Sequence, residues 1–322
     1  MTQTVNKWVR LEQPRLGSRV TFATDEFFAA KERLIDPADP VFIDGKYDDH
    51  GKWMDGWESR RKRVPGHDYC VIHFGIPGVI HGVEVDTSHF TGNYPPHVSI
   101  EACVSKDDVP EDGWVEIVPK TGIAGDAHSY LDVRNETEFT HVRLHIYPDG
   151  GIARLRVFGE IKADFTNVDG YVDLAAVEHG GHAIACSDQH YGSVQNLLVP
   201  GRGANMGDGW ETARRRGPGN DWVIIALAQP GVIARAEIDT AHFKGNYPDR
   251  VSLEGALFDS DDDAVNDSPE WKTLLRESKL KMDQQHYFDD TLEDIGPVSH
   301  VRVSIYPDGG ISRVRLFGEV HG

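Results

Sequence analysis

Apolar and polar side chains alternate with a period of two along much of this chain. Val142, Leu144 and Ile146 are apolar, and polar Arg143 and His145 separate them. The same alternation occurs at 83–86, 98–101 and 153–157. A period of two indicates strands that bury one face.

Short turns separate these alternating runs. Residues 147–151 read Tyr-Pro-Asp-Gly-Gly, which is typical of a turn because Pro fixes φ, Asp can cap its own backbone and Gly tolerates positive φ. Since it joins two alternating runs, we expect a hairpin loop. Helical periodicity is scarce, and we expect short helices only at 24–35 and 271–281. The pattern therefore predicts an all-β protein of the jelly-roll β-sandwich type.

The sequence contains an internal duplication. Blocks 55–58, 86–95 and 141–160 return as 208–211, 239–248 and 300–319. An offset this large is that of a whole domain rather than of a solenoid unit, so we expect two tandem jelly-roll domains, 1–163 and 164–322. The offset grows toward the C-terminus, which predicts an insertion in the second copy at 259–267. The first copy carries extra residues between 36 and 55.

Composition narrows the class of protein. The chain has 322 residues, a net charge of −19 and 39% hydrophobic residues. The acidic balance argues against nucleic-acid or membrane-surface binding, and no apolar run reaches the roughly 18 residues of a membrane span. Cys70, Cys103 and Cys186 have no Cys-x-x-Cys spacing, which disfavours a disulfide framework or a zinc–thiolate site. We expect a cytoplasmic protein, because the N-terminus lacks the apolar core of a signal peptide.

The strongest candidate site is the loop at 86–95, where strand alternation stops. It holds a carboxylate, a hydroxyl, an imidazole and an amide, and such loops often carry function. We predict that His89 is an acid–base group oriented by Asp86, with His242 and Asp239 as the equivalents. A structural role for the histidines is the alternative. An Asp–His pair can also bind a metal, although two ligands do not make a site.

Two further sets of polar residues occur in both copies. Glu58 and Glu211 are candidate acids or ligand-binding carboxylates; salt bridges within the basic run 60–63 are the alternative. Three arginines per copy share one strand parity, so we expect them on one patch that could hold a carboxylate. Neutralisation by Glu84 and Asp86 is the competing interpretation. These arginines are Arg143, Arg154 and Arg156, repeated as Arg302, Arg313 and Arg315.

Together the duplicated blocks resemble the allantoicase family. The blocks are Asp-Gly-Trp-Glu-(Ser/Thr)-x-Arg, Asp-Thr-x-His-Phe-x-Gly-Asn-Tyr-Pro and Tyr-Pro-Asp-Gly-Gly-Ile-x-Arg. They cover the chain from about Arg19 to the C-terminus. The resemblance implies hydrolysis of allantoate to ureidoglycolate and urea in purine degradation. It also implies tandem jelly-roll domains similar to galactose-binding-like modules, and a homo-oligomeric enzyme.

This substrate can be matched to the duplicated residues. Allantoate carries one carboxylate and two ureido groups on a single carbon. Its carboxylate needs a cation, for which Arg61 and Arg214 are candidates beside the arginines above. Its ureido groups need polar partners, for which the candidates are Asn93, Tyr94, Asn246 and Tyr247. The histidines would move protons with help from Glu58 or Glu211. No cofactor is established by these residues, and water activated by a bound divalent metal is an alternative route.

A noncatalytic tandem jelly-roll carbohydrate-binding module is the alternative function. Such a module would present exposed aromatic platforms to sugars, whereas the duplicated loops hold His, Asp, Asn and Glu. The sequence does not decide whether both copies are active. The second copy carries Asn220, Ala213 and Ser304 where the first carries His67, Arg60 and His145.

Overall fold

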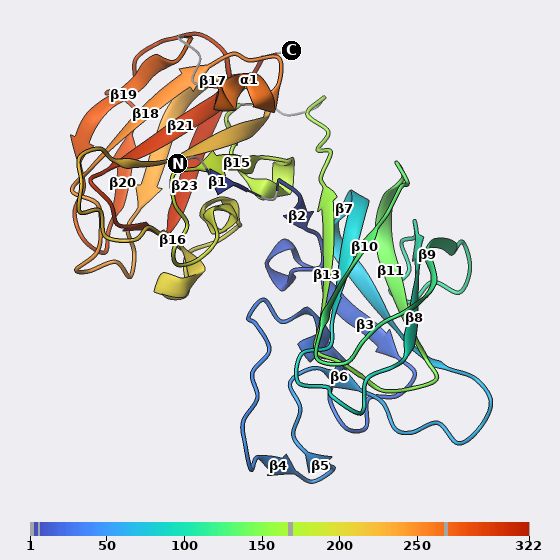
Figure 1. Cartoon of the computed structure of the whole chain (residues 1–322). Helices are drawn as coiled ribbons and strands as arrows, with labels where there is room; N and C mark the ends of the chain where they lie inside the picture. The colour runs from blue at the N-terminus through green and yellow to red at the C-terminus, as the bar shows by residue number, and fades with distance from the viewer. Residues whose placement is uncertain (1–2, 6, 167–169, 267–269, 322) are drawn as a thin grey trace. The chain divides into compact units, whose positions relative to one another are not determined.

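The computed structural model describes residues 3–5, 7–166, 170–266 and 270–321 (Figure 1). The chain divides into two compact units. The first repeat is the unit 8–162, and the second repeat is the unit formed by 163–322 with the residues before Trp8. Strand β1 (Gln3–Thr4) pairs with β15 (His182–Cys186), so this N-terminal strand lies in the second repeat.

The long strand β7 (Asp68–Asp86) organises the first repeat. Its first half pairs with β3 and β11, and its second half pairs with β10 and β13, all antiparallel. One layer is therefore β3-β7-β11-β8-β9, and the other is β10-β7-β13-β2. The strands are β2 (Val9–Arg10), β3 (Arg19–Ala23), β8 (His97–Cys103), β9 (Val115–Gly122), β10 (His128–Asp132), β11 (Glu138–Tyr147) and β13 (Arg154–Glu160).

The second repeat has the same pairing around β17 (Asp221–Asp239). Strands β15 and β21 flank its first half, and β20 and β23 flank its second half. The remaining pairs are β21 with β18, β18 with β19, and β23 with β14. The strands are β14 (Val172–Asp173), β18 (Arg250–Ala256), β19 (Lys272–Lys279), β20 (Gln285–Phe288), β21 (Val298–Tyr306) and β23 (Arg313–Val320). The predicted all-β fold of two duplicated jelly-roll sandwiches is confirmed.

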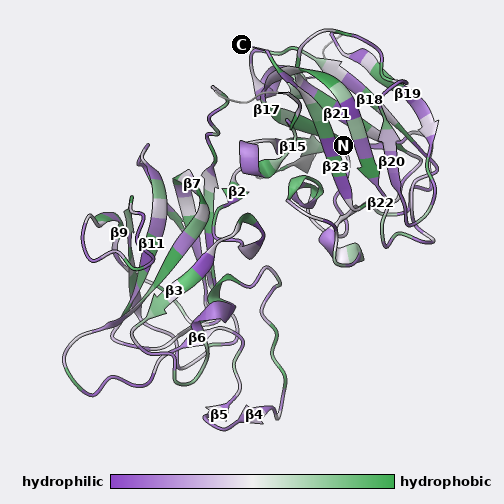
Figure 2. Cartoon of the chain, turned by 180° about the vertical axis from the view of Figure 1, so that it is seen from behind, coloured by the Kyte–Doolittle hydropathy of each residue, from purple (hydrophilic) through white to green (hydrophobic). Residues whose placement is uncertain are grey.

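The alternating pattern places the core between the two layers of each sandwich. Val142, Leu144 and Ile146 on β11 are fully buried, as expected for one face of a strand. Hydrophobic and hydrophilic positions follow one another along strands such as β17 and β21 (Figure 2). Trp57 and Trp210 are also fully buried, and each indole N–H donates to a backbone carbonyl at 2.8 Å.

The prediction of a hairpin at 147–151 is wrong. Strands β11 and β13 do not pair with each other, because each pairs with a different half of β7. After the turn, β12 (Gly151–Ile152) pairs with β6 (Trp57–Glu58). The turn therefore carries the chain from one layer to the other. The second repeat does the same with β22 (Gly310–Ile311) and β16 (Trp210–Glu211).

The helix predictions were only partly correct. Residues 24–35 contain one 3-10 turn, η2 (Lys31–Ile35). The segment 271–281 contains β19 (Lys272–Lys279) instead of a helix, because pairing with β18 overrides the local pattern. The other 3-10 turns are η1 (Pro14–Leu16), η3 (Val177–His179), η4 (Val194–Leu198) and η5 (Met206–Asp208). No helix in the described part of the chain is long and apolar enough to cross a membrane.

Each predicted insertion adds a local element. In the second repeat, 259–267 contains the short helix α1 (Asp261–Val265); residue 267 lies outside the described residues. In the first repeat, 36–55 contains the small hairpin of β4 (Tyr47–Asp48) and β5 (Gly51–Lys52).

Candidate active site

The duplicated Asp-Gly-Trp-Glu segment is held rigidly in the first repeat. The Asp55 carboxylate accepts a hydrogen bond from Arg154 Nη2 at 2.9 Å. A Cβ at Gly56 would lie 2.3 Å from the carbonyl oxygen of Ile152, so only glycine fits this close approach. These contacts fix the backbone that carries Glu58, which ends the segment.

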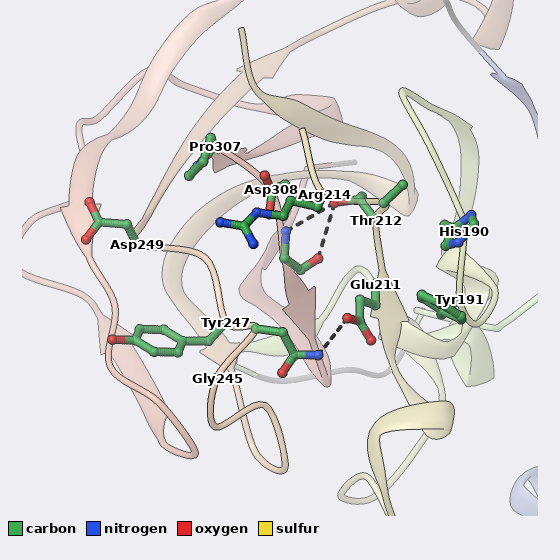
Figure 3. Close-up of a pocket in the computed structure, with 13 residues that line it drawn as sticks. His190, Tyr191, Glu211, Thr212, Arg214, Gly245, Tyr247, Asp249, Pro307 and Asp308 are labelled. Atoms are coloured by element: carbon green, nitrogen blue, oxygen red, sulfur yellow. Dashed lines mark hydrogen bonds between the residues drawn. The ribbon is translucent and has the colours of Figure 1, made fainter. Parts of the chain in front are cut away.

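The glutamate of this segment binds an asparagine in both repeats. Asn93 Nδ2 donates to Glu58 Oε1 at 2.7 Å, and Asn246 Nδ2 donates to Glu211 Oε1 at 2.6 Å (Figure 3). The asparagine backbone is fixed as well, since its carbonyl accepts from the N–H of Gly151 or Gly310 at 2.8 Å. The three duplicated blocks of the sequence therefore meet at one point in each repeat.

Burial gives Glu58 unusual acid–base properties. The residue is 9% exposed, and this burial raises the pKa of its carboxyl group, although the hydrogen bond from Asn93 acts in the opposite direction. Burial disfavours the charged form of a carboxyl group. Glu58 therefore holds a proton to a higher pH than an exposed glutamate does.

A cavity of about 600 Å³ opens over the equivalent pair in the second repeat. Glu211 and Asn246 line it, together with Arg214 and Tyr247 (Figure 3). His190, Tyr191, Asp249 and Asp308 also contribute to its wall. A concave site with a few convergent polar groups is the usual form of a small-molecule site.

Arg61 and Arg214 each follow one of these glutamates by three residues. Both side chains are exposed, and neither has an ion-pair partner among the described residues. An arginine that no carboxylate neutralises can bind a carboxylate ligand through two parallel hydrogen bonds. Both remain candidate substrate-binding residues.

The arginine patch predicted for the first repeat is wrong. Arg143 binds Glu101 at 2.5 Å. Arg154 and Arg156 are buried and both donate to the carbonyl oxygen of Ala38. Arg143 is on β11, and it is separated from Arg154 and Arg156 on β13 because these two strands pair with different halves of β7. Arg154 and Arg156 therefore hold the loop that precedes Glu58.

The second repeat shows the same distribution. Arg302 binds Glu254 at 2.6 Å, Arg313 binds Asp208 at 3.1 Å, and Arg315 donates to the carbonyl of Val199 at 2.6 Å. The predicted neutralisation of these arginines by Glu84 and Asp86 is also wrong, because these two carboxylates and their equivalents have other partners. Glu84 binds His128, and Glu237 and Asp239 bind Arg202.

The predicted pairing of His89 with Asp86 is wrong. Asp86 Oδ1 accepts from the backbone N–H of Ser88 at 2.7 Å. The backbone N–H of His89 donates to Asp126 Oδ1 at 2.8 Å, and its ring Nε2 lies 3.3 Å from the carbonyl oxygen of Pro40. This histidine joins its own loop to the loop that precedes β4.

His242 repeats this arrangement. Its backbone N–H donates to Asp283 Oδ1 at 2.7 Å, and its Nε2 lies 2.8 Å from the carbonyl oxygen of Gly203. Asp239 Oδ1 accepts from the N–H of Ala241 at 2.8 Å. Both histidines have positive φ, 69° for His89 and 73° for His242. These contacts explain their presence in both repeats through loop structure.

Sequence reasoning missed the role of the turn aspartates. The Asp149 carboxylate accepts from the backbone N–H of Lys62 at 2.7 Å, and Asp308 accepts from that of Arg215 at 2.8 Å. Each contact fixes the loop residue that follows Arg61 or Arg214. The sequence does contain a signal for this role, because both Tyr-Pro-Asp-Gly-Gly turns have the aspartate.

Tyr247 lines the cavity of the second repeat. Tyr94 packs against Met54, Phe90 and Ala153. Within the described residues, no group of three or more His, Cys, Asp or Glu side chains is arranged to hold a metal ion.

The architecture defines a duplicated β-sandwich protein that presents the same Glu–Asn pair and adjacent arginine in each repeat. The sequence model of the family described as allantoicase repeat matches residues 9–162 and 172–321. The chain belongs to the allantoicase family.

Similar proteins match along almost the whole chain. "Probable allantoicase 2" of Burkholderia pseudomallei (strain K96243) is 56% identical over 98% of this chain and 95% of its own length. "Probable allantoicase" of Ralstonia nicotianae is 55% identical over 97% of this chain and 95% of its own. A crystal structure of allantoicase from Saccharomyces cerevisiae is 39% identical, with a TM-score of 0.84 over 98% of this chain and 94% of that one.

Proposed function

We propose that this protein is an allantoicase, which hydrolyses allantoate to ureidoglycolate and urea in purine degradation. Family membership and the similarity to named allantoicases support this activity. The observation that assigns this activity to a site is the hydrogen-bonded Glu–Asn pair. It recurs in both repeats, and an exposed arginine follows each glutamate by three residues. A carbohydrate-binding module is less well supported, because the relatives above are named as allantoicases.

In this proposal the exposed arginine binds the substrate carboxylate. Arg214 reaches the same cavity as Glu211 and Asn246, so the carboxylate and a ureido arm can be bound together. The second carboxylate oxygen of Glu211 and the amide oxygen of Asn246 can accept hydrogen bonds from ureido N–H groups. Arg61, Glu58 and Asn93 would act in the same way in the first repeat.

The glutamate supplies the proton that the reaction needs. Hydrolysis forms a bond between water oxygen and the central carbon and breaks the bond from that carbon to one ureido nitrogen. Water loses a proton, and the leaving nitrogen gains one. A carboxyl group with a raised pKa, as burial gives Glu58, is suited to donate this proton.

Proton transfer by the glutamate requires no metal ion. An assay can distinguish this route from the metal-assisted alternative. Urea release from allantoate by the purified protein would be measured with and without a chelator. We expect one urea per allantoate at the same rate in both. Loss of activity with the chelator and its return with a divalent ion would favour the metal route. No urea release by folded protein, with or without added metal, would contradict the proposed activity.

We also propose that the enzyme acts in the cytoplasm as a homo-oligomer on a small-molecule substrate. The resemblance to the family supports the oligomer. The net charge of −19 makes nucleic acid and anionic membranes poor partners. Light scattering coupled to size exclusion would test the oligomer, and a mass equal to one chain would contradict it.

A further inference from the structure

Three titratable side chains form a hydrogen-bonded row in the first repeat. His145 Nε2 lies 2.7 Å from Glu101 Oε2, and His145 Nδ1 lies 2.8 Å from His67 Nε2. Glu101 is on β8, His145 is on β11, and His67 directly precedes β7. We call Glu101, His145 and His67 the relay.

The chemistry of the donors fixes the direction of the relay when both rings are neutral. An ionised carboxylate only accepts hydrogen bonds, so His145 donates from Nε2 to Glu101. The Nδ1 of His145 is then an acceptor, and His67 donates to it from Nε2. The proton of neutral His67 is then on Nε2, so Nδ1 carries a lone pair. This Nδ1 has no hydrogen-bond partner among the described residues. His67 is half-exposed, so this nitrogen forms the open end of the relay.

The relay ends at the same turn that holds Glu58 in the candidate active site. The turn at 147–151 contacts both ends of the segment 58–68. Glu58 pairs with Gly151, and the N–H of Asp68 donates to the carbonyl of Pro148 at 3.1 Å. Pro148 and Gly151 are three residues apart, at most about 10 Å of chain. His67, next to Asp68, and Glu58 therefore lie toward opposite ends of the same short turn.

The second repeat lacks the relay but keeps its surroundings. Asn220 replaces His67 and Ser304 replaces His145. Glu254, equivalent to Glu101, remains bound to Arg302 at 2.6 Å. The two sandwiches therefore share a framework that folds with or without the imidazoles.

We propose that His67 is the general base of allantoate hydrolysis in the first repeat, and that Glu101 and His145 are the residues that position it. This inference rests on the proposed function and assigns turnover to the first repeat. His67 Nδ1 takes the proton from water as its oxygen bonds to the central carbon. Glu58 gives a proton to the departing ureido nitrogen as the carbon–nitrogen bond breaks. The proton on His67 then returns to Glu58, so that each turnover leaves the enzyme unchanged.

The environment of the relay favours this division of roles. Burial, and next the charge of Lys62, lower the pKa of His67, while Asp68 and Glu101 raise it and Lys120 lowers it. His67 is therefore largely neutral near pH 7, as a base must be. Burial has the opposite effect on Glu58 and raises its pKa. Environments that separate an acid from a base in this way are typical of catalytic pairs.

Substitutions copied from the second repeat test the relay in the full-length enzyme. We expect His67→Asn to reduce kcat at least about 100-fold, the usual contribution of a general base, and His145→Ser to reduce it less. In the wild type, kcat/KM should fall as pH falls through the pKa of His67, and His67→Asn should abolish this limb. Asn220→Ala in the second repeat is the control and should keep wild-type kcat.

A matched pair of glutamate substitutions separates positioning from folding. Glu101→Gln and Glu254→Gln each weaken one Arg–Glu pair, but only Glu101 belongs to the relay. Because Glu101 raises the pKa of His67, Glu101→Gln should move the acidic limb to lower pH, while Glu254→Gln should leave it in place. A wild type that releases urea while His67→Asn keeps its kcat within about twofold would overturn the relay and leave the proposed function intact. A wild type without urea release would instead contradict the proposed function.

Discussion

The carboxylate of Glu58 is buried, yet no cation pairs with it in the described part of the chain. Its neighbour Asn93 is neutral. Burial of a carboxylate without a counter-charge costs free energy, and a functional role would explain why the residue is kept. The raised pKa of Glu58 makes this cost measurable.

The substitution Glu58→Gln should stabilise the protein more as the pH increases. Above the ordinary glutamate pKa of 4.5, the folded state holds more protons at this site than the unfolded state. Wild-type stability therefore falls as pH rises through that window, whereas glutamine has no proton to lose. Guanidinium denaturation at pH 4.5 and pH 7 would measure this, with exposed Glu116→Gln as the control. A stability difference between Glu58→Gln and wild type that does not grow with pH would contradict the burial argument.

The substitution His242→Ala should lower stability more than His242→Gly does, and both variants should keep the wild-type turnover per folded molecule. Both remove the hydrogen bond to the Gly203 carbonyl, which costs about 1 kcal/mol. Alanine keeps the Cβ strain that histidine already has at a φ of 73°, whereas glycine relieves ~1–2 kcal/mol of it, so the alanine variant should be the less stable of the two. Denaturation and urea-release assays of the two variants would test this. Loss of turnover with unchanged stability would restore the catalytic role that the sequence pattern predicts for this histidine.

At the level of single residues, repetition within the sequence is enough to identify Glu58, Asn93 and Arg61 as candidates. It does not reveal that Asn93 binds Glu58, because their contact depends on how two distant loops are folded. Repetition also cannot show whether His89 is structural or catalytic, because both copies would keep a histidine in either role.

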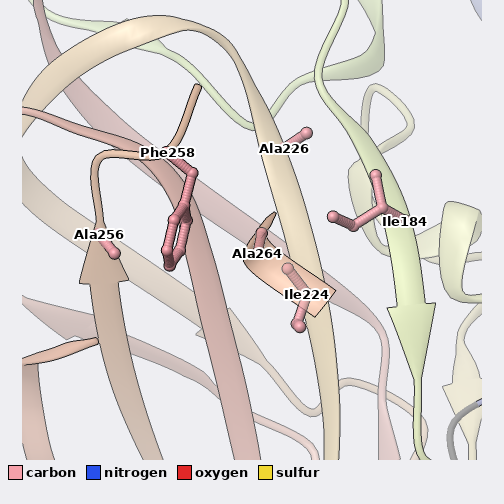
Figure 4. Close-up of a cluster of buried hydrophobic side chains, with 6 residues drawn as sticks. All are labelled: Ile184, Ile224, Ala226, Ala256, Phe258 and Ala264. Carbon is pink, nitrogen blue, oxygen red and sulfur yellow. The ribbon is translucent and has the colours of Figure 1, made fainter. Parts of the chain in front are cut away.

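Among the elements, α1 has no counterpart in the first repeat. Ile224 and Ala226 face away from the sandwich core, because they alternate with fully buried Val223 and Ile225. Ala264 of α1 packs over them (Figure 4). Phe258, Ile184 and Ala256 complete the cluster. The insertion thus adds a small second core on the outer face of β17.

Removing the largest side chain of this cluster should destabilise the second repeat. Phe258 is 8% exposed, and Phe258→Ala should lower the free energy of unfolding by about 3–5 kcal/mol. The neighbouring Leu257 is 53% exposed, so Leu257→Ala should change it by less than about 0.5 kcal/mol. Equal effects of the two substitutions in denaturant unfolding would show that the cluster adds no stability.

Strands were more predictable than connections. The alternation at 83–86, 98–101 and 142–146 depends only on one buried face, and all three segments are strands. The error at 147–151 arose because a turn sequence does not specify which strand its flanks pair with. The helix expected at 271–281 failed because β18 offers backbone partners that the local sequence does not reveal.

For the whole molecule, duplication made the repeated fold and the family predictable. It also hid the difference between the repeats, because a comparison of the copies selects residues that both share. The relay consists of His67, His145 and Glu101, and only its carboxylate has an equivalent in the second repeat. Residues that the second copy has lost can therefore be as informative as those that it has kept.

The most direct test is urea release from allantoate by the wild type and by the double variant Glu58→Gln, Glu211→Gln. The wild type should release one urea per allantoate. The double variant should fold and bind allantoate, because glutamine keeps the shape and the contact with asparagine, but its kcat should be at least about 100-fold lower. Wild-type kcat in the folded double variant would contradict the assignment of proton transfer to these glutamates.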